Sequence, residues 1–185
     1  MLILIPALAL TANVEAPIEL CSDYAATDES FTLDVCDEAL QGDVAYSATI
    51  RASLNPEPAV RQVTIFRHDG QWFVRATGYR WEPGTSLVST RRNELPISAD
   101  DAALIEAQLG AVALSNLAAQ PYYGDDDRIC TDGANFELAA AIDGQRHTAR
   151  QHSCAGNTQL TEITALFLDI AIRYDNGFEG YLGGL

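Results

Sequence analysis

The densest group of carboxylates in the chain is the run Asp125, Asp126 and Asp127, which Asp132 follows closely. Carboxylate oxygens are the ligands that hard cations such as Ca²⁺ prefer, so this run is the candidate metal site of the sequence. The alternating ligands and the final glutamate of an EF-hand loop are absent, and the alternative is a solvated acidic loop. The same aspartates would supply the acid–base groups of a hydrolase.

A second candidate site combines arginines and aromatic residues, the side chains that dominate the energetics of binding interfaces. Its members are Arg67, Trp72, Phe73, Arg75, Tyr79, Arg80 and Trp81. Residues 51–92 hold seven arginines and three acids, a local net charge of +4 that would attract an anionic partner. The alternative is that Trp72 and a second aromatic are core residues and that the arginines pair with nearby acids.

The remaining residues with reactive side chains give no catalytic pattern. His68 lies at an expected turn, and His147 and His152 should point to opposite faces of one strand. The sequence has no G-x-S-x-G elbow, H-E-x-x-H helix, P-loop or glycine-rich dinucleotide motif. We therefore assign no catalytic residue and expect no cofactor.

The cysteines are even in number, which agrees with disulfides in an oxidising compartment. Of three possible pairings we predict Cys21–Cys36 with Cys130–Cys154, because each pair closes a short loop. Each disulfide would contribute about 3 kcal/mol in the chain-entropy model. The alternative is a metal cluster with a histidine, but no spacing matches a C-x₂-C zinc pattern.

The first residues resemble the hydrophobic region of a secretory signal. Residues 2–10 are almost wholly apolar and too short to span a bilayer, and the small residues Ala12 and Ala16 follow them. No basic residue precedes Arg51, so the charged start of a signal is missing, and the alternative is a buried N-terminal strand. With the cysteines, this segment predicts a periplasmic or extracellular protein without a stable membrane anchor.

Composition and charge narrow the class of protein further. A chain of 185 residues with 48% hydrophobic content is long enough for one domain with a real core. Its net charge is −15, and all eleven basic residues are arginines. An acidic surface repels phosphates and anionic lipids, so we expect no binding to nucleic acid.

Strand signals are clearest in three places. Residues 44–54 alternate between apolar and polar side chains, which predicts a half-buried strand. The Asp69-Gly70 and Asp143-Gly144 pairs each predict a tight hairpin. A two-residue turn at the first pair places Arg67 opposite Trp72 and leaves Phe66 and Phe73 together on the other face. The same turn at the second pair places Glu137 opposite Arg150.

Two helices are expected, one between the two hairpins and one after the second hairpin. The first begins at Ser98, where Asp101 favours an N-cap, and Gly110 weakens it enough to break it into two pieces. The second begins at Asn157 or Thr158 and carries an apolar stripe from Leu160 to Ile170. These elements predict an α+β fold, in which an antiparallel sheet of hairpins is covered on one face by two helices.

The expected organisation follows from these signals. Residues 1–16 form a signal-like hydrophobic segment, 17–42 an exposed acidic loop region held by the first disulfide, 43–178 the α+β domain and 179–185 a Gly-rich tail. We expect an exported, non-enzymatic binding or accessory protein whose partner is a protein or a small molecule. The alternatives are a cell-envelope hydrolase that uses the aspartate run and a purely structural envelope component.

Overall fold

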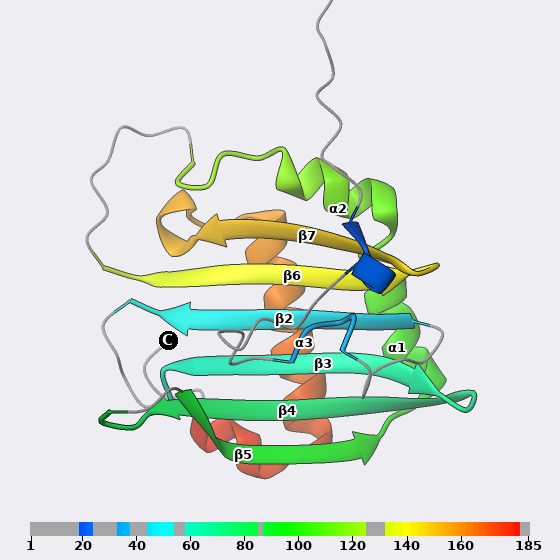
Figure 1. Ribbon diagram of the computed structural model, residues 1–185, viewed down its shortest axis with the longest axis horizontal. Coiled ribbons are helices and arrows are strands. Elements are labelled where there is room, and N and C mark those ends of the chain that lie inside the picture. Colours follow the sequence, from blue (N-terminus) through cyan, green and yellow to red (C-terminus); the bar gives the residue numbers. More distant parts are fainter. Residues whose placement is uncertain are drawn as a thin grey trace, which may run out of the picture.

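Seven strands form one antiparallel sheet in the computed structural model, which describes residues 19–23, 33–37, 44–53, 58–84, 87–124 and 132–181. The strands are β1 (Glu19–Leu20), β2 (Val44–Ala52), β3 (Val60–His68), β4 (Gln71–Trp81), β5 (Leu87–Pro96), β6 (Ala134–Ile142) and β7 (Gln145–His152). Their order across the sheet is β1-β7-β6-β2-β3-β4-β5 (Figure 1). The signal-like segment 1–16 lies outside the described residues.

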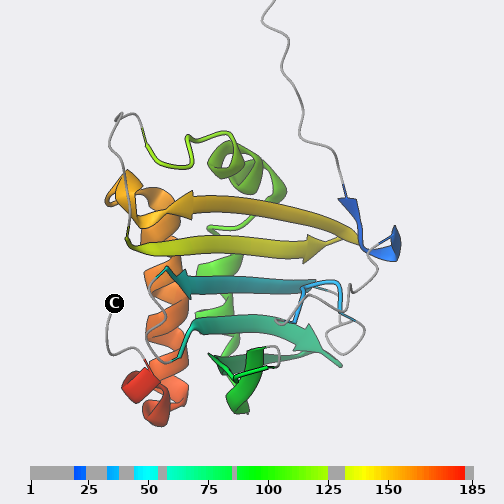
Figure 2. The same ribbon diagram turned by 60° about the vertical axis from the view of Figure 1, so that its left-hand side comes forward.

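The α-helices lie together on one face of the sheet. They are α1 (Ala99–Glu106), α2 (Ala111–Ala118) and α3 (Gln159–Tyr174), with short 3₁₀ helices η1 (Cys21–Asp23), η3 (Ser153–Ala155) and η4 (Asn176–Tyr181). Helix α3 runs across the strands on one side of the sheet, and η1, which follows the edge strand β1, lies away from it (Figure 2). The predicted α+β fold with a helical layer on one face is confirmed.

Both hairpins have the predicted register. Asp69 and Gly70 have φ angles of 49° and 76°, and Asp143 and Gly144 have 51° and 74°. Two successive residues with positive φ form the type of turn that suits the twist of a hairpin. Arg67 therefore pairs with Trp72 in β3–β4, as the sequence predicts.

The helix signals are confirmed at residue level. The Ser98 side chain accepts a hydrogen bond from the Asp101 N–H, and Thr158 forms a capping box at the start of α3. The first predicted helix is divided by Gly110, which is the N-cap of α2, so the layer holds three α-helices rather than two. Their inward side chains form the main core with one face of the sheet, including Ile105, Leu114, Phe167 and Ile170.

Strand β5 is the main element that the sequence did not predict. It pairs with β4 at the edge of the sheet, with a register shift between Gly78 and Tyr79. Its sequence lacks a clean alternation and contains Arg91-Arg92-Asn93-Glu94 at its centre. Edge strands often carry charges and end in proline, which hides the period-two pattern.

Residues 33–37, in the segment before β2, are not an exposed loop. The predicted Cys21–Cys36 disulfide is present. Val35 is 2% exposed, and with Cys36 it packs against Phe66 on the face of the sheet opposite the helices. Phe66 and Phe73 stack with ring centroids 5.7 Å apart beneath this segment. Apolar contacts thus hold residues 33–37 on the sheet.

Helices α1 and α3 are connected through one carboxylate. Asp101 Oδ2 accepts hydrogen bonds from the Tyr174 hydroxyl at 2.6 Å and from the Ser98 hydroxyl at 3.0 Å. Arg173 forms an ion pair with the other oxygen. The hydrogen bond from Tyr174 is the largest cause of a lowered pKa for Asp101, and Ser98 and Arg173 add to it against the opposing effect of burial.

We expect the stability of the protein to depend on the titration of Asp101. A carboxyl whose pKa is lower in the folded protein stabilises the fold above its ordinary pKa of 3.8, and this contribution is lost as pH falls through the folded value. Urea unfolding of wild type and Asp101→Asn should therefore differ most above about pH 5 and converge in more acidic buffer. The control is Asp100→Asn, at the exposed neighbouring position. A difference for Asp101→Asn that stays constant down to acidic pH would contradict this expectation.

Candidate ligand-binding site

The face of the sheet opposite the α-helices is called here the open face. One end of this face carries a grid of polar side chains from three adjacent strands. Thr49 in β2 lies opposite Glu137 in β6, which lies opposite Arg150 in β7. In the next row, Arg51 lies opposite Asn135. Because side chains alternate between the faces of a sheet, both rows point away from the helices.

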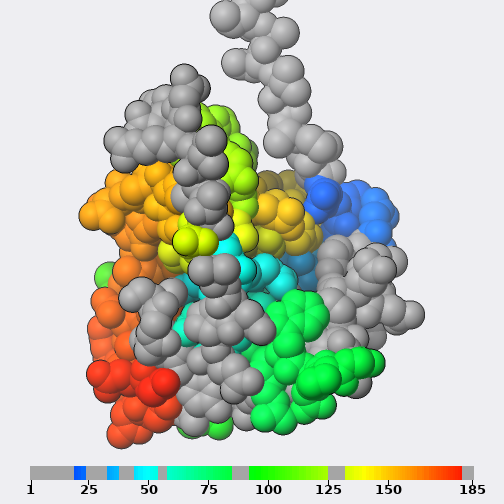
Figure 3. Space-filling model, turned by 90° about the vertical axis from the view of Figure 1, so that its left-hand side faces the viewer, coloured from blue at the N-terminus to red at the C-terminus, as the bar shows by residue number. Residues whose placement is uncertain are grey.

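A pocket of about 250 Å³ lies over this grid. The described residues that line it are Thr49, Arg51, Tyr122, Asn135, Phe136, Glu137 and Arg150. Figure 3 looks onto this end of the sheet, with the helices on the left and the N-terminal segment on the right, and atoms of β2, β6 and β7 reach the surface there. The volume is below the usual range for drug-sized ligands, so the pocket suits a small molecule or one group of a larger one.

An ion pair forms part of the pocket floor. The Arg150 Nε donates to Glu137 Oε2 at 2.6 Å, as the hairpin register predicted. Arg146 lies on the other side of Glu137, with its Nη2 3.9 Å from Oε1. The Arg150 side chain is 63% exposed and uses its Nε for Glu137, which leaves its terminal nitrogens facing outward from the pair.

Tyr122 forms a wall of the pocket, and a hydrogen bond to its backbone carbonyl holds it in place. The His152 N–H donates to the Tyr122 carbonyl at 2.8 Å, and the Tyr123 ring packs against both Tyr122 and His152. The Tyr122 hydroxyl donates to Asn135 Oδ1. Burial is the main cause of a raised pKa for Tyr122, Tyr123 adds to it and Arg150 opposes it. The hydroxyl therefore keeps its proton and fixes the orientation of the Asn135 amide.

Gly133 brings the ends of three strands together beside the pocket. Its carbonyl accepts from the Ser53 N–H at 2.8 Å, and the Ser153 hydroxyl accepts from the Ala134 N–H at 3.0 Å. The φ angle of Gly133 is 133°, and a Cβ at this position would lie 2.2 Å from Ser153 Oγ. Only glycine fits this approach.

A hydrogen-bonded side chain connects the pocket with the disulfide-linked segment. The Gln62 Nε2 donates to the Leu33 carbonyl at 2.7 Å and to Thr49 Oγ1 at 3.3 Å. The Thr49 hydroxyl lines the pocket and still has its own proton to donate. The N-terminal segment thus orders part of the pocket floor.

The arginine and aromatic residues selected from the sequence do not form one surface. Arg67 lies 5.5 Å from the centre of the Trp72 ring beside the hairpin turn, on the face that carries the helices. Arg75 is 4% exposed on the opposite face, where it donates twice to Glu94 Oε2 and lies 5.0 Å from the centre of the Phe66 ring.

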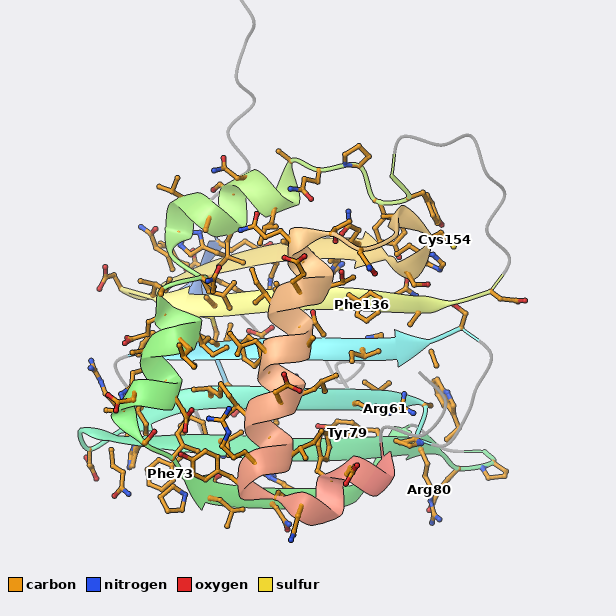
Figure 4. All side chains as sticks on the ribbon, turned by 180° about the vertical axis from the view of Figure 1, so that it is seen from behind. Arg61, Phe73, Tyr79, Arg80, Phe136 and Cys154 are labelled. Carbon is orange, nitrogen blue, oxygen red and sulfur yellow. A yellow bond between two sulfur atoms is a disulfide. The ribbon has the colours of Figure 1, made fainter. Side chains whose placement is uncertain are left out.

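The other members of this set lie apart as well. Tyr79 is buried on the open face, and Phe73 lies near the turn at the other end of β4 from Arg80 (Figure 4). Arg80 pairs with Glu82 at 2.8 Å, and Trp81 next to it is about half exposed. Of the seven residues, Arg80 and Trp81 remain as exposed neighbours at the end of β4.

The other predicted site residues are described only in part. Cys154 is disulfide-bonded, and its predicted partner Cys130 lies outside the described residues. The run 125–127 also lies outside them, whereas Asp132 is exposed. Within the described part of the chain, no group of three or more His, Cys, Asp or Glu side chains is arranged to hold a metal ion. No helix of that part is long and apolar enough to cross a membrane.

Comparison with known proteins finds no match. No protein-family model, no characterised protein and no solved structure is significantly similar to the chain. A function for the pocket therefore has to be inferred from the chemistry of its own residues.

Sequence reasoning missed the pocket because it depends on contacts between distant parts of the chain. The hairpin register identified Glu137 and Arg150 as a pair, but the pairing of β2 with β6 joins residues about ninety positions apart. Tyr122 arrives from a third segment, in the turn that follows α2. A polar alternation in β2, with Thr49 and Arg51 on one face, was a second local signal.

Proposed function

We propose that this is an exported, non-enzymatic binding protein that holds a small molecule in the pocket at the end of the open face. The observation that carries the proposal is the pocket itself, in which polar side chains project from three paired strands. Strands fix side-chain positions more rigidly than loops do, so such a site is organised before its ligand arrives. A periplasmic or extracellular location is supported by the Cys21–Cys36 disulfide, because disulfides persist in oxidising compartments.

The pocket chemistry favours binding over hydrolysis. Acid–base hydrolysis by carboxylates requires two carboxyl groups on either side of the scissile bond. Among the described residues that line the pocket, Glu137 is the only carboxylate, and Arg150 pairs with it. The hydrolase alternative rests on Asp125, Asp126 and Asp127, and no observation on the described residues favours it.

The test is an NMR titration of the oxidised, ¹⁵N-labelled protein with a mixed panel of small acids, amines, amides and sugars. We expect at least one compound to shift the backbone amide signals of Thr49, Asn135 and Arg150 in a saturable way. The amides around Trp81 in β4, which lies two strands away from β2 in the sheet, are the internal control and should not move. If every compound leaves the pocket amides unchanged, or moves only signals elsewhere, the proposal is wrong.

A further inference from the structure

The polar groups of the pocket are mainly hydrogen-bond donors. Asn135 accepts from Tyr122 through Oδ1, which leaves both N–H groups of its amide directed elsewhere. The Thr49 hydroxyl accepts from Gln62, so it can donate its own proton. Arg150 uses Nε for Glu137, and no further hydrogen bond of its guanidinium is formed with the described residues.

Among the described residues, side-chain acceptors are few at the same site. The Glu137 carboxylate is directed at Arg150 and Arg146, and the Tyr122 oxygen is a further acceptor near Asn135. A ligand that complements these donors has to provide hydrogen-bond acceptors. A carboxylate brings two oxygens with about four lone-pair sites and accepts the fork of an arginine in a fixed geometry.

The charge of the pocket points the same way. Among the described lining residues, Arg51 and Arg150 are cationic, and the carboxylate of Glu137 is paired with Arg150 and lies near Arg146. The chain as a whole carries −15. Arginines on an acidic protein favour an anionic group, and the rest of the protein repels a monoanion less strongly than a phosphate dianion.

We propose that the pocket binds its small molecule through a carboxylate group, held by the terminal nitrogens of Arg150, the amide of Asn135 and the hydroxyl of Thr49. This assignment rests on the proposed binding function and names the ligand class. The Tyr122 ring at the wall provides apolar surface for the body of the ligand.

The test uses three probes of nearly equal shape and different charge: benzoate, benzamide and benzylamine. Each is titrated into the oxidised protein and followed at the amides of Thr49, Asn135 and Arg150. We expect benzoate to bind most tightly, and Arg150→Gln to weaken it about 10-fold or more, since a hydrogen bond between charged groups is lost. Arg150→Lys, which keeps the charge without the fork, should lie between the two.

The matched control is Arg80→Gln. Arg80 is also a half-exposed arginine that pairs with a glutamate, but it lies near the opposite edge of the sheet. This variant should bind benzoate as wild type does, and equal weakening by Arg80→Gln and Arg150→Gln would reveal nonspecific attraction and overturn the assignment. The NMR spectrum of each variant without probe reports whether it is folded.

The remaining outcomes separate this inference from the proposed function. If benzamide or benzylamine binds at the pocket as tightly as benzoate or more tightly, the carboxylate assignment is wrong and the binding function stands. If none of the three probes moves the pocket amides, the carboxylate assignment also fails. The binding function itself falls only when the broader panel leaves the pocket unchanged as well.

Discussion

The Asp34→Ala variant should lose about 3 kcal/mol of unfolding free energy, because it leaves Arg146 without its closest partner. Asp34 accepts hydrogen bonds from Arg146 Nε and Nη2, the latter at 2.7 Å, and both side chains are only 10% exposed. Burial alone would lower the pKa of Arg146. Its hydrogen bonds with Asp34 and Glu19 and the charge of Glu137 outweigh burial and raise that pKa above its ordinary value.

The expected loss follows from what remains around the arginine. Breaking a buried ion pair costs about 3–5 kcal/mol, since the surviving charge has lost its water and its partner. Arg146 keeps Glu19 at 2.8 Å, and Glu137 lies nearby, so the lower end of that range applies. Urea unfolding with linear extrapolation measures the difference.

Glu19→Ala is the matched control, because it removes another acid that is hydrogen-bonded to the same arginine. The Glu19 side chain is 60% exposed, and exposed ion pairs contribute less than about 1 kcal/mol. A third variant, Asp34→Asn, keeps a side chain that can accept from the Cys36 N–H, a contact of 3.0 Å in the native protein, and removes only the charge. Equal losses for Asp34→Ala and Glu19→Ala would show that burial of the pair does not matter.

The features that the sequence predicted well are local ones. Two Asp-Gly pairs determined two turns, and each turn determined the register of its hairpin, because a two-residue loop leaves one alignment of the strands. Ser98 and Thr158 began helices for an equally local reason, since their side chains accept from backbone N–H groups within the first turn. The Cys21–Cys36 disulfide closes a short loop and was predicted on that ground.

The features that the sequence did not predict depend on pairing at long range. Nothing near Asp34 indicates that it meets Arg146, more than one hundred residues later. Strand β5 was missed because it is held at the edge of the sheet by its pairing with β4, whereas its own residues do not alternate cleanly. The arginine and aromatic residues do not form one surface for a related reason, since consecutive residues of one strand point to opposite faces of the sheet.

Removing the Cys21–Cys36 disulfide should lower the unfolding free energy by about 3 kcal/mol. The bridge joins residues 15 positions apart. In the chain-entropy model, closing a loop of that size lowers the conformational entropy of the unfolded chain and so stabilises the folded protein by this free energy. The variant is Cys21→Ala with Cys36→Ala, because alanine places no polar atom at the buried Cys36 site. Urea unfolding under oxidising conditions is the measurement, and a loss below about 1 kcal/mol would show that the reduced, unfolded segment retains structure.

Combining this variant with Asp34→Ala tests whether the disulfide and the ion pair hold the same segment. Asp34 lies two residues before Cys36, and Val35 between them is buried on the open face beside Phe66. Once residues 33–37 have left the sheet, neither the disulfide nor the ion pair can contribute further, so the total loss is limited by the free energy that docks the segment. The triple variant should therefore lose less than the two separate losses added together, by a coupling of about 0.5–3 kcal/mol. Strict additivity would mean that the segment stays docked by its apolar contacts alone. In that case the contact between Val35 and Phe66, rather than the ion pair, holds residues 33–37 on the open face.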